Sequence, residues 1–187
     1  MALHRGATLT LTALRAAVAG GRRRVPAGVA VLLQALDARM NATSVFATLP
    51  LPPGGDVAGA FARWLDAGAP GLADAARDCD QDGHFEQVRP GPPPRLRGLD
   101  RAGFLAMIDA MLTTSRSFYR ITIAEPEAVR DAFVAEALAS GAPAEFFAAD
   151  VQSLAPRFEY FDGMDNDHCL VWTSAGRMHV LLTNGSD

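Results

Sequence analysis

A proline-rich segment near the middle of the chain, PGPPPRLRG at residues 90–98, limits the possible fold more than any other feature. Proline fixes one backbone dihedral and lacks an N–H donor, so neither an α-helix nor a central β-strand can run through consecutive prolines. The composition favours a stiff, polyproline-like linker, with a ligand for a proline-reading domain as the alternative. The segment therefore divides the chain into two stretches that must each supply their own helices and strands.

The first stretch alternates between extended and helical patterns. Pro26 is well placed in the first turn of a helix, and the apolar spacing from Val29 to Met40 is helical. Asp56 is a typical N-cap for the next helix. The sequence therefore predicts a strand and short helix at 8–19, helices at 26–42, 56–67 and 71–77, and strands at 44–51 and 84–89.

The second stretch repeats this order. It predicts helices at 100–112, 126–139 and 143–154, and strands at 117–124 and 157–161. The tripeptide GAP at 68–70 recurs at 141–143, and the dipeptide FE at 85–86 recurs at 158–159. Shared element order with turn residues in step predicts an internal repeat of residues 26–89 and 99–162.

The C-terminal segment predicts a β-hairpin at residues 168–184, because HCLVWTS and RMHVLLT flank a two-residue Ala-Gly turn. Residues 1–187 are expected to form a single α+β domain with a mostly antiparallel sheet and helices on one face. Its core would consist of two similar α-β-α-α-β halves completed by the hairpin.

All 17 permanently cationic side chains are arginines, and the chain contains no lysine. This composition is typical of a high-GC, bacterial coding sequence. The absence of lysine excludes a Walker-type phosphate loop, a protein kinase and Schiff-base chemistry by their usual routes. No apolar run reaches the roughly 18 residues of a membrane span. We therefore expect a cytoplasmic protein with no membrane association.

The arginines are unevenly distributed: residues 1–36 contain five and no acidic residue, whereas the net charge of the whole chain is −4. Arg22, Arg23 and Arg24 are contiguous and are candidate contacts for an acidic partner, either another protein or a second copy of the chain. The short run without aromatic residues argues against nucleic acid. The composition of residues 1–36 also resembles an organellar transit peptide, which is the alternative reading.

Two segments contain residues that could bind a metal ion. Asp162, Asp165, Asp167 and His168 offer oxygen and imidazole ligands within seven residues, although a polar turn has the same composition. Residues 78–86 copy the first half of a calcium-binding loop, but Arg89 occupies the position of its bidentate glutamate. Together the segments contain Cys79, His84, His168 and Cys169, the ligand types of a zinc site, at spacings unlike those of common zinc modules.

The sequence predicts a non-enzymatic binding or interaction protein without a cofactor. The alternative is a metal-dependent hydrolase that uses the Asp/His cluster at 162–169. A third hypothesis is a small-molecule sensor with its pocket between the two halves. Nucleophilic catalysis has little support, although a Cys79–His84 or a Cys169–His179 pair is conceivable. Trp64 and Trp172 are expected to be core or interface anchors, Cys169 is expected in the core, and His179 is expected on the polar side of its strand.

Overall fold

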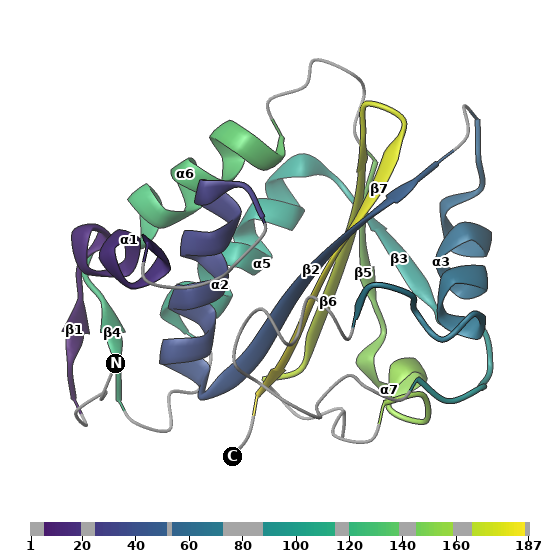
Figure 1. Cartoon of the computed structure of the whole chain (residues 1–187), viewed down its shortest axis with the longest axis horizontal. Helices are drawn as coiled ribbons and strands as arrows, with labels where there is room; N and C mark the ends of the chain where they lie inside the picture. The colour runs from purple at the N-terminus through teal and green to yellow at the C-terminus, as the bar shows by residue number, and fades with distance from the viewer. Residues whose placement is uncertain are drawn as a thin grey trace.

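The computed structural model describes residues 6–19, 25–51, 54–72, 88–114, 120–138, 145–158 and 166–185 (Figure 1). These ranges contain both helices and strands, which confirms the α+β class. The helices are α1 (Leu11–Ala19), α2 (Ala27–Met40), α3 (Val57–Asp66), α5 (Arg101–Thr113), α6 (Pro126–Ala137) and α7 (Val151–Leu154). The strands are β1 (Thr8–Leu9), β2 (Ala42–Pro50), β3 (Leu96–Leu99), β4 (Thr122–Ile123), β5 (Phe146–Ala149), β6 (His168–Ser174) and β7 (Arg177–Gly185).

Local signals explain where the helices begin and end. The side chains of Asp56 and Asp100 cap α3 and α5 by accepting hydrogen bonds from the N–H groups of Gly59 (3.0 Å) and Gly103 (2.7 Å). α2 ends at Asn41, whose φ of 50° is a left-handed conformation that asparagine tolerates well. The N-terminal ends of α3 and α5 were therefore predictable from their single capping residues.

Five strands form an antiparallel sheet in the order β2-β7-β6-β5-β3, and β1 pairs with β4 in a separate parallel pair. β6 and β7 pair across the turn at Ala175–Gly176, at the place where the sequence predicts a hairpin. β2 then pairs with β7 along nine residues, from Ala42 opposite Gly185 to Pro50 opposite Arg177. The last strand of the chain is thus held between β6 and the early strand β2.

Helices cover both faces of this sheet, so the prediction of helices on one face is wrong in that detail (Figure 1). α1, α2, α5 and α6 lie on one side, and α3 and α7 lie on the other. The apolar residues of β6 are consecutive rather than alternating: Leu170 and Trp172 pack on the first side, and Cys169 and Val171 on the second. A strand buried on both faces needs a layer of structure on each.

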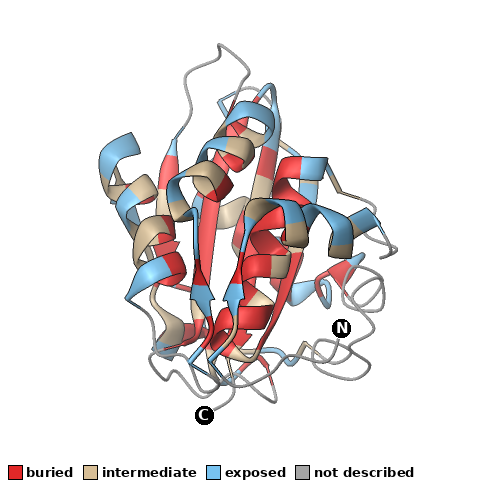
Figure 2. Ribbon diagram, turned by 90° about the vertical axis from the view of Figure 1, so that its left-hand side faces the viewer, coloured by how far each residue is buried: buried red, intermediate tan, exposed pale blue. Residues whose placement is uncertain are grey.

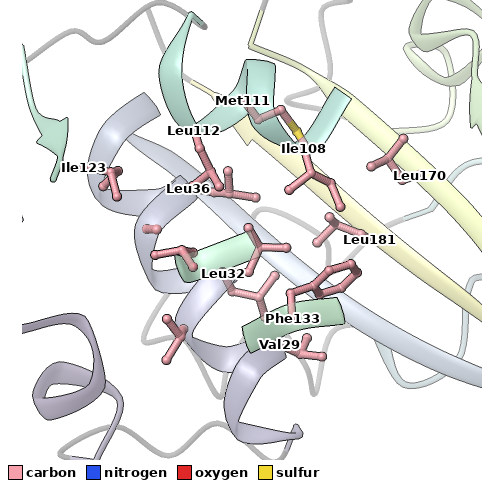
Figure 3. Close-up of a cluster of buried hydrophobic side chains, with 14 of the residues drawn as sticks. Val29, Leu32, Leu36, Ile108, Met111, Leu112, Ile123, Phe133, Leu170 and Leu181 are labelled. Carbon is pink, nitrogen blue, oxygen red and sulfur yellow. The ribbon is translucent and has the colours of Figure 1, made fainter. Parts of the chain in front are cut away.

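The larger core lies under the four helices of the first side, and Figure 3 shows part of it. α2 is buried almost all round, because α1, α5, α6 and the sheet surround it. Buried residues concentrate at the centre of the molecule, whereas exposed residues lie on the outer surfaces of the helices (Figure 2). The labelled members of this helical core are Val29, Leu32, Leu36, Ile108, Met111, Leu112, Ile123, Phe133, Leu170 and Leu181.

The second core, here called the α3 core, packs α3 and α7 on the opposite face of the sheet. Phe61, Trp64 and Leu65 of α3 contribute to it, and so does Cys169 of β6. Trp64 and Cys169 are buried here, and Trp172 is buried in the helical core, so the predicted core positions of all three residues are confirmed.

Two segments differ from their predicted structure. The predicted helix at 143–154 contains β5, and of its described residues, 145–154, only the four of α7 are helical. β5 pairs with both β3 and β6, so tertiary pairing overrides the local helical pattern. Part of the predicted linker is also a strand, because Leu96–Leu99 pair with β5 at the edge of the sheet. The prolines end before this strand begins.

The internal repeat stays a prediction. α2 and α5 occupy matching positions of the two stretches and both pack in the helical core. In contrast, α3 packs in the α3 core, whereas α6 packs on α2. Much of both stretches, including residues 73–87 and 159–165, lies outside the described residues.

The closest approach of α2 and α6 depends on Gly28. A Cβ atom at this position would lie 2.1 Å from the carbonyl oxygen of Ala132, so no larger residue fits without a shift of backbone. The Gly28 N–H also donates a 2.8 Å hydrogen bond to the Glu136 carboxylate. A carboxylate at the first turn of a helix is favourable, since the helix dipole is positive there. These contacts fix how the N-terminus of α2 meets the C-terminus of α6.

Candidate ligand-binding pocket

Several residues singled out from the sequence lie outside the described residues. These are Arg22, Arg23 and Arg24 of the basic run, Asp162 and Asp165 of the acidic cluster, and the whole of residues 78–86. The partner-binding arginines, the calcium-like loop and the zinc ligands Cys79 and His84 therefore stay predictions.

Asp167 and His168 are described, and they lie on opposite faces of the sheet. The buried Asp167 carboxylate accepts a 2.9 Å hydrogen bond from the Asn184 amide, next to the α3 core. His168 pairs with Thr183 and alternates with Cys169, which packs in the α3 core, so its side chain belongs to the helical side. Within the described ranges, no three His, Cys, Asp or Glu side chains are close enough to hold a metal ion.

Cys169 and His179 also lie on opposite faces, so the conceivable Cys–His pair does not form. Cys169 is buried in the α3 core, and burial raises the pKa of its thiol far above the usual range. A thiol held in its neutral form is a poor nucleophile. His179 lies on the other face, where its ring stacks on Phe46 and Trp172 of the helical side.

A cavity of about 390 Å³, here called the His179 pocket, opens at one end of the sheet. It lies where the N-terminus of α2, the C-terminus of α6, the end of β2 and the β6–β7 turn come together, and Figure 1 shows these element ends. Its wall is largely apolar: Val25, Pro26, Val29, Phe46 and Ala137. Its polar lining is Thr48, Glu136, Ser174, Arg177 and His179.

The hairpin register brings Ser174 and His179 to the same face of the sheet. Ser174 pairs with Arg177 across a turn whose two residues, Ala175 and Gly176, have φ values of 49° and 71°. Such positive φ values are typical of the two-residue turns that match the twist of a hairpin. His179 follows Arg177 by two residues, so the pleat turns its side chain to the same side.

Two hydroxyl groups hold the imidazole of His179. Its Nε2 atom lies 2.8 Å from Ser174 Oγ, and its Nδ1 atom lies 3.1 Å from Thr48 Oγ1. Thr48 is the register partner of His179 across β2 and β7, although 131 residues separate the two in the chain. Both ring nitrogens therefore have a hydrogen-bond partner that can either donate or accept.

Aromatic rings fix the orientation of the imidazole. The His179 ring lies nearly parallel to Phe46, with an angle of 8° and ring centroids 5.8 Å apart. It also stacks on Trp172 at 5.2 Å. Phe46 lines the cavity, whereas Trp172 is fully buried behind it. The prediction that His179 faces a polar side is therefore only partly right, since its neighbours are two hydroxyls and two aromatic rings.

The pKa of His179 is lowered, mainly because burial disfavours the charged imidazolium. The positive charge of Arg177 lowers this pKa further, and a hydrogen bond to the Ser174 backbone partly opposes the decrease. His179 is therefore neutral at pH 7, with one ring nitrogen that donates and one that accepts. The pocket thus contains a rigid, uncharged imidazole beside a buried serine hydroxyl.

A second cavity of about 430 Å³ lies between α1, α2 and α6. Its lining is mostly small and aliphatic, with Arg15 and Glu136 as the polar residues. Glu136 separates the two cavities, because it lines both and is hydrogen-bonded to Gly28. The His179 pocket differs from this cavity in that an imidazole and two side-chain hydroxyls, hydrogen-bonded to one another, face an apolar wall, which is the usual lining of a ligand site.

The sequence contains part of the signal for this site. A two-residue turn at 175–176 places Ser174 and His179 on one face, so the predicted hairpin already implied their proximity. The long-range pairing that adds Thr48 and Phe46 has no local signal.

None of the described helices is both long and hydrophobic enough to cross a lipid bilayer. Comparisons with protein-family models, with characterised proteins and with solved structures found no match to this chain.

Proposed function

We propose that this chain is a binding protein that holds a small, mainly apolar ligand with one polar edge in the His179 pocket. The observation that carries the proposal is an imidazole, fixed by two hydroxyls and two rings, in the lining of a largely apolar cavity. The cavity volume of about 390 Å³ lies at the small end of the usual range for ligand sites, roughly 300–1,000 Å³.

The polar groups of the pocket indicate how a ligand would be oriented. Ser174, Thr48 and His179 lie on the sheet side, so they would meet the polar edge of the ligand. The apolar wall of Val25, Pro26 and Val29 comes from the α2 side and would cover its apolar body. Burial of that body supplies most of the affinity, since apolar transfer contributes about 25 cal/mol per Å².

Charge at the rim favours a ligand with an anionic group. Arg177 is exposed and lines the pocket, so its guanidinium is available to an anion. Glu136 also lines the pocket, but its carboxylate accepts the hydrogen bond from the Gly28 N–H. An anionic ligand group bound near Arg177 would also lie close to His179, whose neutral ring carries no charge to attract it, so Arg177 is the cation that it would contact.

The aromatic anion 1-anilinonaphthalene-8-sulfonate is a suitable probe, because it pairs an apolar ring system with a sulfonate. We expect its fluorescence to rise on titration with the folded protein, well below the unfolding temperature. Thr48→Phe should fill the pocket and weaken this binding at least tenfold. The matched control is Thr12→Phe, which adds the same ring to an exposed position of α1 outside both cavities. Equal binding by wild type and Thr48→Phe would contradict the proposal.

Other expectations from the sequence stay predictions beside this proposal. Docking of a protein partner or a second copy through Arg22–Arg24 is compatible with a ligand-regulated binding protein. The alternative, a metal-dependent hydrolase, would need Asp162 and Asp165, since Asp167 and His168 lie on opposite faces. No observation favours that alternative over the His179 pocket.

A further inference from the structure

We propose that Ser174 is a nucleophile that accepts an acyl group from a small ester bound in the His179 pocket, with His179 as its general base. This inference rests on the proposed function, because the ester must first occupy the pocket. It goes beyond binding, since it assigns a covalent reaction to a residue pair that ligand binding alone does not need.

The geometry has the three parts that an activated serine requires. Ser174 Oγ lies 2.8 Å from His179 Nε2, within the range for direct proton transfer. The other ring nitrogen, Nδ1, lies 3.1 Å from Thr48 Oγ1, which is the place of the orienting group. Stacking on Phe46 and Trp172 prevents the ring from turning away from the serine. All three polar residues line one cavity that can contain a substrate.

The reaction proceeds in balanced steps. The reaction uses the tautomer of His179 with its proton on Nδ1, hydrogen-bonded to Thr48; Nε2 then accepts the Ser174 hydroxyl proton while Oγ bonds to the ester carbonyl carbon and the carbonyl π electrons move to its oxygen. The tetrahedral intermediate then collapses, the bond from this carbon to the leaving oxygen breaks, and the imidazolium returns the proton to the leaving alcohol. Water repeats the sequence on the acyl-serine, releases the carboxylic acid and restores both residues.

Two features of the pocket set the expected rate. Arg177 lines the same cavity and is the cation that can stabilise the oxyanion of the intermediate. The orienting group, however, is a neutral hydroxyl, where serine hydrolases use a carboxylate that fixes the tautomer and stabilises the imidazolium; replacement of that carboxylate by its amide lowers turnover about 10⁴-fold in the best-known case. Because both acylation and deacylation use His179, we expect both to be slow, so that an activated ester places at most one acyl group on each chain and the acyl group is released more slowly than it forms.

A fluorophosphonate probe tests the nucleophile directly, because the serine oxygen displaces fluoride and the adduct stays on the protein. We expect a single adduct by intact mass, with peptide mapping to Ser174. Ser174→Ala and His179→Gln should abolish it. The matched control is Ser153→Ala, because Ser153 is equally buried but its hydroxyl donates to the Asp150 carbonyl, not to an imidazole. If the adduct on the wild-type protein maps to any other residue, or if no adduct forms, the assignment of Ser174 is overturned.

The pH dependence of labelling separates a base from a merely structural partner. Labelling should slow as the pH falls and His179 becomes protonated, and the midpoint should report its pKa in the presence of Arg177 and Glu136, which also line the pocket. 4-Nitrophenyl butyrate should give a burst of about one nitrophenol per chain. A rate of labelling independent of pH between about 5 and 8 would contradict general-base activation.

Parallel titration with anilinonaphthalene sulfonate distinguishes the two proposals. Probe binding without labelling of Ser174 would refute the nucleophile and leave the binding function standing. Labelling of Ser174 without probe binding would support the nucleophile and contradict the stated ligand chemistry. If folded wild-type protein neither binds the probe nor is labelled at Ser174, both proposals are refuted.

Discussion

Arg157 and His179 represent two ways in which this fold accommodates a polar side chain. Arg157 is only 1% exposed, and its guanidinium donates hydrogen bonds to the Gly91 and Pro92 carbonyl oxygens and to Asp66 of α3. His179, on the other side of the sheet, is only partly buried and lines a cavity. Arg157 is occupied entirely by groups of its own chain, whereas His179 keeps a surface for another molecule. The first residue stabilises the fold, whereas the second is the residue to which we assign the proposed binding of a ligand.

The first and largest test of this comparison is Arg157→Leu. The Gly91 and Pro92 carbonyl oxygens would lose a charged donor whose side chain is itself buried, so we expect the free energy of unfolding to fall by about 3 kcal/mol. Asp66 contributes little to this loss, because its side chain is 60% exposed and remains hydrated. Urea denaturation measures the change, and binding to the His179 pocket should persist in the folded fraction.

The control for that variant is Arg130→Leu. Arg130 pairs with Asp109 and Asp131 near the surface, so its loss should cost less than about 1 kcal/mol. Equal destabilisation by the two variants would remove the structural role assigned to Arg157.

The second test, Gly28→Ala, asks whether binding in the His179 pocket depends on the packing of α2 against α6. The new Cβ would clash with the Ala132 carbonyl, so α2 and α6 must separate at an expected cost of about 2 kcal/mol. The shift would also move Pro26 and Glu136, so probe binding should weaken together with stability. Gly98→Ala is the control, since a Cβ there meets no atom within 4 Å. Thermal unfolding and probe titration of both variants check the prediction; wild-type probe affinity in Gly28→Ala would show that the pocket does not depend on this contact.

The third and smallest effect is the pH dependence of stability. The folded-state pKa of His179 is lowered, so below the usual histidine pKa of about 6.5 the unfolded chain takes up a proton first. The contribution of His179 is therefore complete above about pH 6.5 and declines as the pH falls through its folded-state pKa. His179→Phe keeps the stacking and removes the titration.

The measurement compares urea midpoints of wild type and His179→Phe at pH 5 and pH 8. The difference between the two proteins isolates His179, because His168 and the undescribed histidines are common to both. An identical pH dependence would mean that His179 is not held in its neutral form, and the contrast with Arg157 would lose its electrostatic basis.

The parts of the fold that follow from local signals were predictable. Asp56 and Asp100 mark helix starts because a carboxylate satisfies N–H groups that no helical partner can reach. The Ala-Gly pair at 175–176 marks the hairpin for an equally local reason. These signals act over a few residues, so a single sequence contains them.

Pairing between strands that are far apart in the sequence determined the parts of the fold and of the candidate site that local signals did not predict. Phe146 and Phe147 lie in a pattern that fits a helix, yet they form a strand because β3 and β6 supply partners on both sides. In the candidate site, Ser174 and His179 are local to one hairpin, whereas Thr48 and Phe46 arrive only through the pairing of β2 with β7. Half of the site was therefore accessible to sequence reasoning.

The pairing of β2 with β7 also has a consequence for synthesis of the protein. Thr48 leaves the ribosome 131 residues before His179, a delay on the order of 10 s at ordinary rates of translation. During that interval β2 lacks β7, its one neighbour among the described strands of the sheet, so an apolar strand edge is open to other chains. The His179 pocket therefore cannot form before β7 has been synthesised, and a ligand can stabilise only a chain that already contains this strand.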